Sequence, residues 1–180
     1  EAQVGPPSPL SVPLVLESGG GKGEPNAMFI YAGDLARPGS AGPVNLRTLD
    51  SVPLLQCGAL LERRAYFGNN MARPMPSVAD QYLGACERLR YVLVIREKAY
   101  VKPALLLEAR HFDKGRLDAD VLAFEVASGA LVGGYSFSAT NDERVSLLDG
   151  DADHVQRLIT NLESTTFNAL RDGARATFPG

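Results

Sequence analysis

The densest group of side chains with metal-binding or acid–base capacity lies between positions 111 and 120. It consists of one imidazole and three carboxylates, namely His111, Asp113, Asp118 and Asp120. Strand alternation would place Asp118 and Asp120 on the same face, and histidine together with carboxylates can hold a divalent metal. A small metal-dependent hydrolase is therefore one hypothesis. We favour a structural role, because aspartate is common in turns for its own backbone hydrogen bonds.

The glycine-rich segment ESGGGKGEPN, residues 17–26, is the next candidate, because it resembles a phosphate-binding loop. A P-loop requires Gly-Lys followed by Ser or Thr at the start of a helix. Here Gly23 follows Lys22, and Pro25 turns the chain instead of extending a helix. We therefore expect a hairpin tip that joins residues 12–17 to residues 27–32, and we expect no cofactor.

Nucleophilic catalysis has one weak candidate. Ser136 lies in Gly-Tyr-Ser-Phe-Ser, which lacks the final glycine of a nucleophile elbow, and the only histidine after it is His154. With two histidines in the whole chain, the options for acid–base catalysis are few. We interpret Ser136 as a strand residue and expect no catalytic residue.

Predicted loops carry the residues best suited to protein contacts. These are Arg37 in one loop, Met71, Arg73 and Met75 in a second, and Tyr100 between two lysines in a third segment that forms an edge or a projecting turn. Arginine and methionine are frequent in protein interfaces. The competing interpretation is that all three segments are ordinary surface loops.

The two cysteines are predicted to lie on the inner faces of two helices. Cys57 follows Leu54 and precedes Leu61 at helical spacing, and Cys86 shares a helical face with apolar neighbours. A disulfide between them would close 28 intervening residues and stabilise the fold by roughly 3 to 4 kcal/mol. Exported proteins keep such bonds. The alternative is two unrelated buried thiols.

Hydrophobic patterns predict the elements that position these residues. Helices are expected from Pro53 to before Gly68 and from Ser77 to about Leu89, and a final helix begins near Asp151 or Asp153 and stops at Gly173. Strands are expected at residues 27–32, 90–97, 104–112, 116–126 and 130–138. Residues 90–97 are apolar on both faces, which is typical of a central strand covered on both sides. The last three strands should form an antiparallel meander.

These elements predict a single α+β domain over residues 11–180, preceded by a flexible Pro-rich tether at residues 1–10. The central sheet should be mostly antiparallel, with a C-terminal meander and helices packed mainly on one face. A net charge of -3 argues against nucleic-acid binding. The chain contains no run of 18 apolar residues, so no transmembrane segment is predicted.

Two segments carry a resemblance to known proteins. Residues 91–95, YVLVI, resemble a buried strand that follows the second helix, and residues 121–132 resemble a strand, a Ser-Gly turn and a return strand. Both are similar to the TolB N-terminal-like domain and to lipoprotein activators of penicillin-binding proteins, over residues 77–174. The resemblance implies a non-catalytic periplasmic or outer-membrane-associated module that is lipid-anchored before Glu1 and binds an envelope protein. The uncharged start of the chain, EAQVGPPSPL, is typical of a tether that follows a removed export signal.

A third hypothesis is a carrier that holds a small ligand between the sheet and the helices. Its candidate lining residues are aromatic side chains predicted to lie on strands, namely Tyr91, Phe124, Tyr135 and Phe137. The envelope binding module is our leading prediction. The metal-dependent hydrolase and the ligand carrier are its alternatives.

Overall fold

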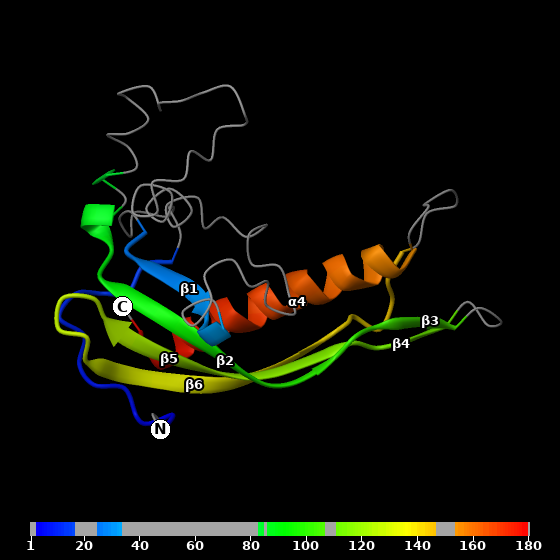
Figure 1. Ribbon diagram of the computed structural model, residues 1–180, viewed down its shortest axis with the longest axis horizontal. Coiled ribbons are helices and arrows are strands. Elements are labelled where there is room, and N and C mark those ends of the chain that lie inside the picture. The colour runs from blue at the N-terminus through cyan, green and yellow to red at the C-terminus, as the bar shows by residue number, and fades with distance from the viewer. Residues whose placement is uncertain are drawn as a thin grey trace.

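The computed structural model describes residues 3–16, 25–33, 83–84, 86–106, 111–146 and 154–179. These residues form a four-stranded mixed sheet, a two-stranded hairpin and a long C-terminal helix packed against the sheet (Figure 1). The elements are β1 (Ala27–Tyr31), β2 (Tyr91–Val101), β3 (Ala104–Leu106), β4 (His111–Asp113), β5 (Arg116–Glu125), β6 (Leu131–Thr140) and α4 (His154–Thr177). The predicted α+β class is confirmed.

The sheet has the strand order β1-β2-β5-β6. β1 runs parallel to β2, whereas β2 pairs with β5, and β5 with β6, in antiparallel fashion. Ile95, Val121 and Tyr135 are aligned across three neighbouring strands, so their side chains share one face. The mostly antiparallel sheet is thus confirmed, with β2 and β5 at its centre.

The two faces of the sheet differ in burial. We call the face that α4 covers the helix face and the opposite one the outer face. On β2 the helix-face side chains Tyr91, Leu93 and Ile95 are buried, and they form one core with Leu170 of α4. Val92 and Val94 point to the outer face and are half-buried. Leu122 of β5, opposite Val94 on the outer face, is buried, so this face is covered in part, and the strand is central, as predicted.

A β-bulge at Lys98 changes the alternation of β2. The register shifts between Glu97 and Ala99, so that Lys98 has no partner of its own on β5. An extra residue inverts the side on which later side chains lie. Tyr100 consequently pairs with Leu117 and faces α4. The strand also continues to Val101, where a break was predicted after residue 97.

The predicted strand at residues 104–112 is divided in the structure. β3 and β4 pair with each other as a separate two-stranded antiparallel sheet. The meander of three successive strands from residue 104 was therefore wrong. The antiparallel trio of the main sheet is β2, β5 and β6, and the β3/β4 hairpin lies beyond the ends of β2 and β5 (Figure 1).

Helix α4 packs by the predicted apolar stripe. Its side chains at i, i+4 spacing are buried, namely Leu158, Leu162, Thr166 and Leu170. The predicted stop at Gly173 was wrong, because the helix continues to Thr177. A Cβ at Gly173 would overlap the ring of Tyr135, so this glycine permits close packing instead of ending the helix.

The N-terminal segment does not form the expected hairpin with β1. Residues 13–16 are not a strand, and β1 pairs with β2 instead. The hydroxyl of buried Tyr91 donates to Val12 O at 2.7 Å and accepts from Val12 N at 3.1 Å. Asn26 Oδ1 accepts from Val15 N at 2.8 Å, and Asn26 Nδ2 donates to Pro13 O at 2.9 Å. These side chains hold the segment against the sheet. Residues 17–24 lie outside the described ranges.

Several predictions from the sequence fall on residues that the structure does not describe. The helix expected at residues 53–67 and the loops with Arg37, Met71, Arg73 and Met75 lie outside the described ranges, as does Cys57. Residues 83–84 and 86–88 are helical, as predicted for the end of the second helix. The disulfide between Cys57 and Cys86 stays a prediction.

Candidate functional site

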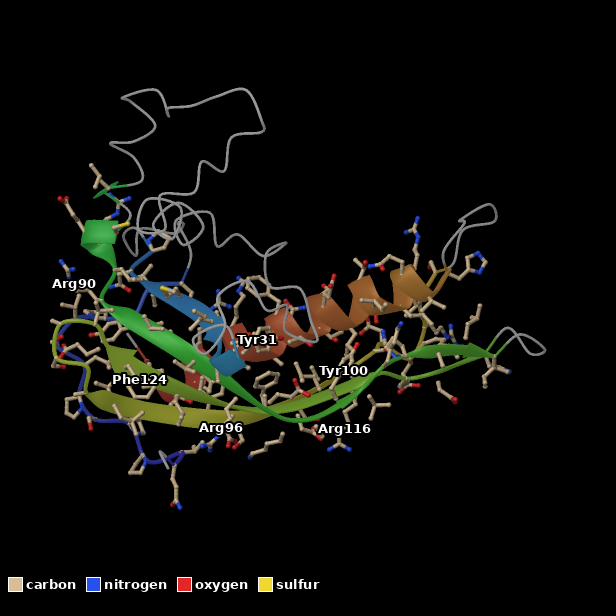
Figure 2. All side chains as sticks on the ribbon, viewed as in Figure 1. Tyr31, Arg90, Arg96, Tyr100, Arg116 and Phe124 are labelled. Atoms are coloured by element: carbon tan, nitrogen blue, oxygen red, sulfur yellow. The ribbon has the colours of Figure 1, made fainter. Side chains whose placement is uncertain are left out.

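Charged side chains gather on the outer face, where β2, β5 and β6 lie side by side. The outer-face cluster consists of Arg96, Lys98, Arg116, Asp118, Asp120, Ser136 and Ser138. The register aligns Arg96, Asp120 and Ser136 across the three strands, and it pairs Asp118 with Ser138. Figure 2 shows Arg96 and Arg116 on the side of the sheet away from α4, and Tyr31 and Tyr100 on the side of the helix.

Asp120 is the centre of this cluster. Its carboxylate accepts hydrogen bonds from Arg96 Nη2 at 2.9 Å and from Ser136 Oγ at 2.6 Å, and Lys98 Nζ lies 2.5 Å from Oδ1. The side chain of Asp120 is only 4% exposed, whereas that of Lys98 is 52% exposed. The cations therefore form the outer surface of the cluster, and the acid lies beneath them.

The pKa of Asp120 reflects this environment. Burial raises the pKa, but hydrogen bonds from Lys98, Ser136 and Arg96, together with the charge of Lys98, outweigh burial and lower it to about 2. The carboxylate is thus ionised throughout the physiological pH range. A carboxylate held in this state positions cations well, but it is a poor general acid or base.

The ionised Asp120 predicts a specific loss of stability in acid. Its folded-state pKa of about 2 lies below the ordinary value, so its stabilisation is present above about pH 4 and is lost as the pH falls towards 2. We expect wild-type protein to lose roughly 2 kcal/mol over this range relative to Asp120→Asn, as measured by urea unfolding. Parallel pH profiles of the two proteins would contradict the assignment.

Asp118 and Arg116 form a second, more exposed pair. Arg116 Nε donates to Asp118 Oδ1 at 2.9 Å, and the Arg116 side chain is 56% exposed. Hydrogen bonds from Ser138 and Arg116 lower the pKa of Asp118, against a small opposing effect of burial. Both strand carboxylates are therefore engaged by protein donors.

The predicted metal-ligand set is not assembled. Asp118 and Asp120 do share one face, as predicted, but His111 and Asp113 belong to β4 in the separate hairpin. Among the described residues, no group of three or more His, Cys, Asp or Glu side chains is placed to hold a metal ion. In addition, Arg96 and Lys98 already neutralise the carboxylate of Asp120, which disfavours a metal ion there.

Tyr100 was predicted to be a partner-binding residue in an edge or a projecting turn, and this role stays a prediction. The bulge at Lys98 turns Tyr100 to the helix face, where it is half-buried against the core. Burial raises the pKa of Tyr100, and the charges of Glu163 and Glu97 add to the effect. Tyr100 therefore serves packing beneath α4.

The four aromatic residues proposed for a ligand carrier do not face one space. Tyr91, Tyr135 and Phe137 lie on the helix face, whereas Phe124 pairs with Val92 on the outer face. The Tyr135 hydroxyl donates to Leu170 O at 2.5 Å, and burial raises its pKa. The structure thus separates Phe124 from the other three, which are packing residues of the core.

Ser136 lies within β6, as predicted, and its hydroxyl donates to Asp120. The sequence interpretation missed Arg96, Lys98 and Arg116 as members of one site. A signal was present for Arg116, because Arg116 and Asp118 are two positions apart on a predicted strand, whereas Lys98 lies in the break that was predicted after residue 97. Charge at such spacing indicates a polar sheet face, but only the strand register shows which charges meet.

No helix among the described residues is long and apolar enough to cross a membrane. Comparison with protein-family models and with curated protein sequences finds no match.

Proposed function

We propose that this chain is a non-catalytic binding or accessory module of the bacterial cell envelope, and that it binds a partner protein through the outer-face cluster. The observation that carries the proposal is the layering of charge in this cluster. Arg96, Lys98 and Arg116 are 31%, 52% and 56% exposed, while Asp120 beneath them is 4% exposed. The cluster therefore presents cations to solvent.

The chemistry of the titratable groups supports a non-catalytic role. The pKa values of Asp118, Asp120 and Glu125 are lowered, mainly by hydrogen bonds that outweigh any effect of burial, and those of Tyr100 and Tyr135 are raised mainly by burial. Each shift moves the pKa of its group further from neutral pH. A general acid or base works best with a pKa near the operating pH, so these groups suit structure and recognition.

The expected partner is a protein segment rich in carboxylates. Asp120 holds Arg96 and Lys98 in place before binding, which reduces the side-chain entropy lost when a partner forms charge-assisted hydrogen bonds. Ser136 and Ser138 lie on the next strand of the same face, where their hydroxyls hydrogen-bond to Asp120 and Asp118. The exposed cations Arg96, Lys98 and Arg116 would accept an acidic segment lying across β2 and β5.

The envelope setting is supported by the resemblance of residues 91–95 and 121–132 to the TolB N-terminal-like domain and to activators of penicillin-binding proteins. These segments correspond to the start of β2 and to the hairpin of β5 and β6. We propose a periplasmic or outer-membrane-associated location on this basis. Fractionation of the native cell tests it, because recovery of the protein in the cytoplasm would contradict the proposal.

Reversing the charge of Arg116 is expected to weaken partner binding. In a pull-down from the native envelope fraction, Arg116→Glu should reduce recovery of the partner about tenfold, since one attraction becomes a repulsion. Lys102→Glu is the matched control, because this exposed lysine follows β2 and lies outside the outer-face cluster. The proposal fails if no protein is recovered in an amount that depends on Arg116, or if both variants behave alike.

A further inference from the structure

Among the described residues, strand β6 forms one edge of the main sheet, and beyond the bulge at Val132 and the bond from Ser8 at its start it lacks the usual protection of an edge. Natural edge strands are interrupted by charged residues, proline or short length, because an open edge pairs with other chains. Residues 131–141, LVGGYSFSATN, contain no charged residue and no proline. The strand is ten residues long, and the described residues place a neighbouring strand, β5, on one side only. The edge beyond Val132 can therefore accept another strand.

The backbone contacts at the two ends of β6 show which residues point away from the sheet. Asn141 N donates to Gly115 O, so residue 141 points inward to β5, whereas Val132 O accepts from Ser8 N on the outer side. Alternation from these ends turns the amide and carbonyl groups of four residues outward. They are Gly134, Ser136, Ser138 and Thr140. Among the described residues, Ser8 supplies the only backbone partner at this edge, at the start of the strand.

We propose that β6 is the interface of a homodimer, in which two copies pair their β6 strands in antiparallel fashion about a two-fold axis at Phe137. This register sets Ser136 opposite Ser138 of the second copy, and Gly134 opposite Thr140. All four outward residues then meet outward residues, so the hydrogen-bonding pattern is satisfied along the strand. A two-fold axis brings the same strand of both copies together, so any charge on β6 would meet a like charge. Because β6 is uncharged, no such repulsion opposes the pairing.

The flank of α4 above β6 is compatible with a second copy. Asn161 bonds to Asn141 and Asp142 at one end of β6, and Gly173 packs on Tyr135 within it. Helical spacing places small residues between these points on the same flank. They are Asn161, Thr165, Ala169 and Gly173, which carry no charge. At about 100° per residue, Asp172 also lies close to the direction of Asn161, and Arg175 Nη1 lies 3.9 Å from the Asp172 carboxylate.

Sedimentation velocity over a range of concentrations tests the proposal on the unmodified chain. Wild-type protein should sediment as a dimer that dissociates on dilution. Ser136→Lys with Ser138→Lys should sediment as a monomer, because the introduced lysines oppose each other across the axis. A wild-type monomer at every concentration would overturn the proposal, as would a dimer that persists in the double-lysine variant.

A charge-swapped variant tests the register. Ser136→Lys with Ser138→Glu places opposite charges across the axis, so the dimer should return, whereas a monomer would overturn the axis at Phe137. Ala127→Lys with Ala130→Lys adds two positive charges at exposed positions of the turn and should leave the dimer intact. Circular dichroism and the unfolding midpoint confirm that each variant is folded. Ser136 and Ser138 are exposed, so the new side chains extend into solvent.

Discussion

Replacing Asn141 with alanine is expected to lower the free energy of unfolding by about 3 kcal/mol. Asn141 is 2% exposed and joins three parts of the fold. Its Oδ1 accepts from Gly115 N at 2.8 Å, and its Nδ2 donates to Leu158 O at 2.7 Å and to Asn161 Oδ1 at 3.0 Å. Alanine leaves these groups unsatisfied and creates a cavity between sheet and helix. Urea unfolding with linear extrapolation measures the loss.

Asn168→Ala is the matched control for this prediction. Asn168 lies on the exposed side of α4, so the same substitution there should change stability by less than about 0.5 kcal/mol. An Asn141→Ala variant as stable as Asn168→Ala would contradict the role of Asn141 as the polar link between β6 and α4. Asn161→Ala should fall between the two, because its side chain is only half-buried.

Gly173→Ala is expected to destabilise the protein by about 2 kcal/mol, although the same change in an exposed helix is stabilising by roughly 1 kcal/mol. The new methyl group would meet Cε2 and Cδ2 of the Tyr135 ring. Tyr135 cannot withdraw easily, because its hydroxyl donates to Leu170 O beneath the helix. The free energy of unfolding from urea titration, or the thermal midpoint, measures the effect.

A double-mutant cycle separates the steric conflict from helix propensity. In a Tyr135→Leu background the ring is absent, so Gly173→Ala should become neutral or stabilising. The sign change identifies the Tyr135 ring as the cause. Equal effects of Gly173→Ala in both backgrounds would show that the glycine has some other role in α4.

Much of the fold was predicted from local patterns. Alternating apolar residues located β5 and β6, and the turn between them contains Gly129, whose φ of 69° suits glycine. The apolar stripe at helical spacing located the body of α4. The alternation of side chains along a strand also predicted that Asp118 and Asp120 lie on the same face. These predictions succeeded because each depends on residues that are near each other in the chain.

The site was predicted less well than the fold, because its members come from three strands. Asp120 was identified as a candidate ligand, but its partners Arg96 and Lys98 lie more than twenty residues earlier. The register decides which side chain lies opposite a carboxylate. It therefore decides whether the carboxylate pairs with an arginine or lysine or stays available to bind a metal ion. The sequence of one strand does not contain that register.

The sequence by itself determined the α+β class, the hairpin of β5 and β6 and the buried stripe of α4, since hydrophobic periodicity and turn chemistry are local properties. Only the tertiary structure decided the inward side of Tyr100, the continuation of α4 through Gly173 and the pairing of β3 with β4. A one-residue bulge reverses a strand's faces, and a glycine that ends one helix permits close packing in another. Such choices depend on the partner that each segment meets.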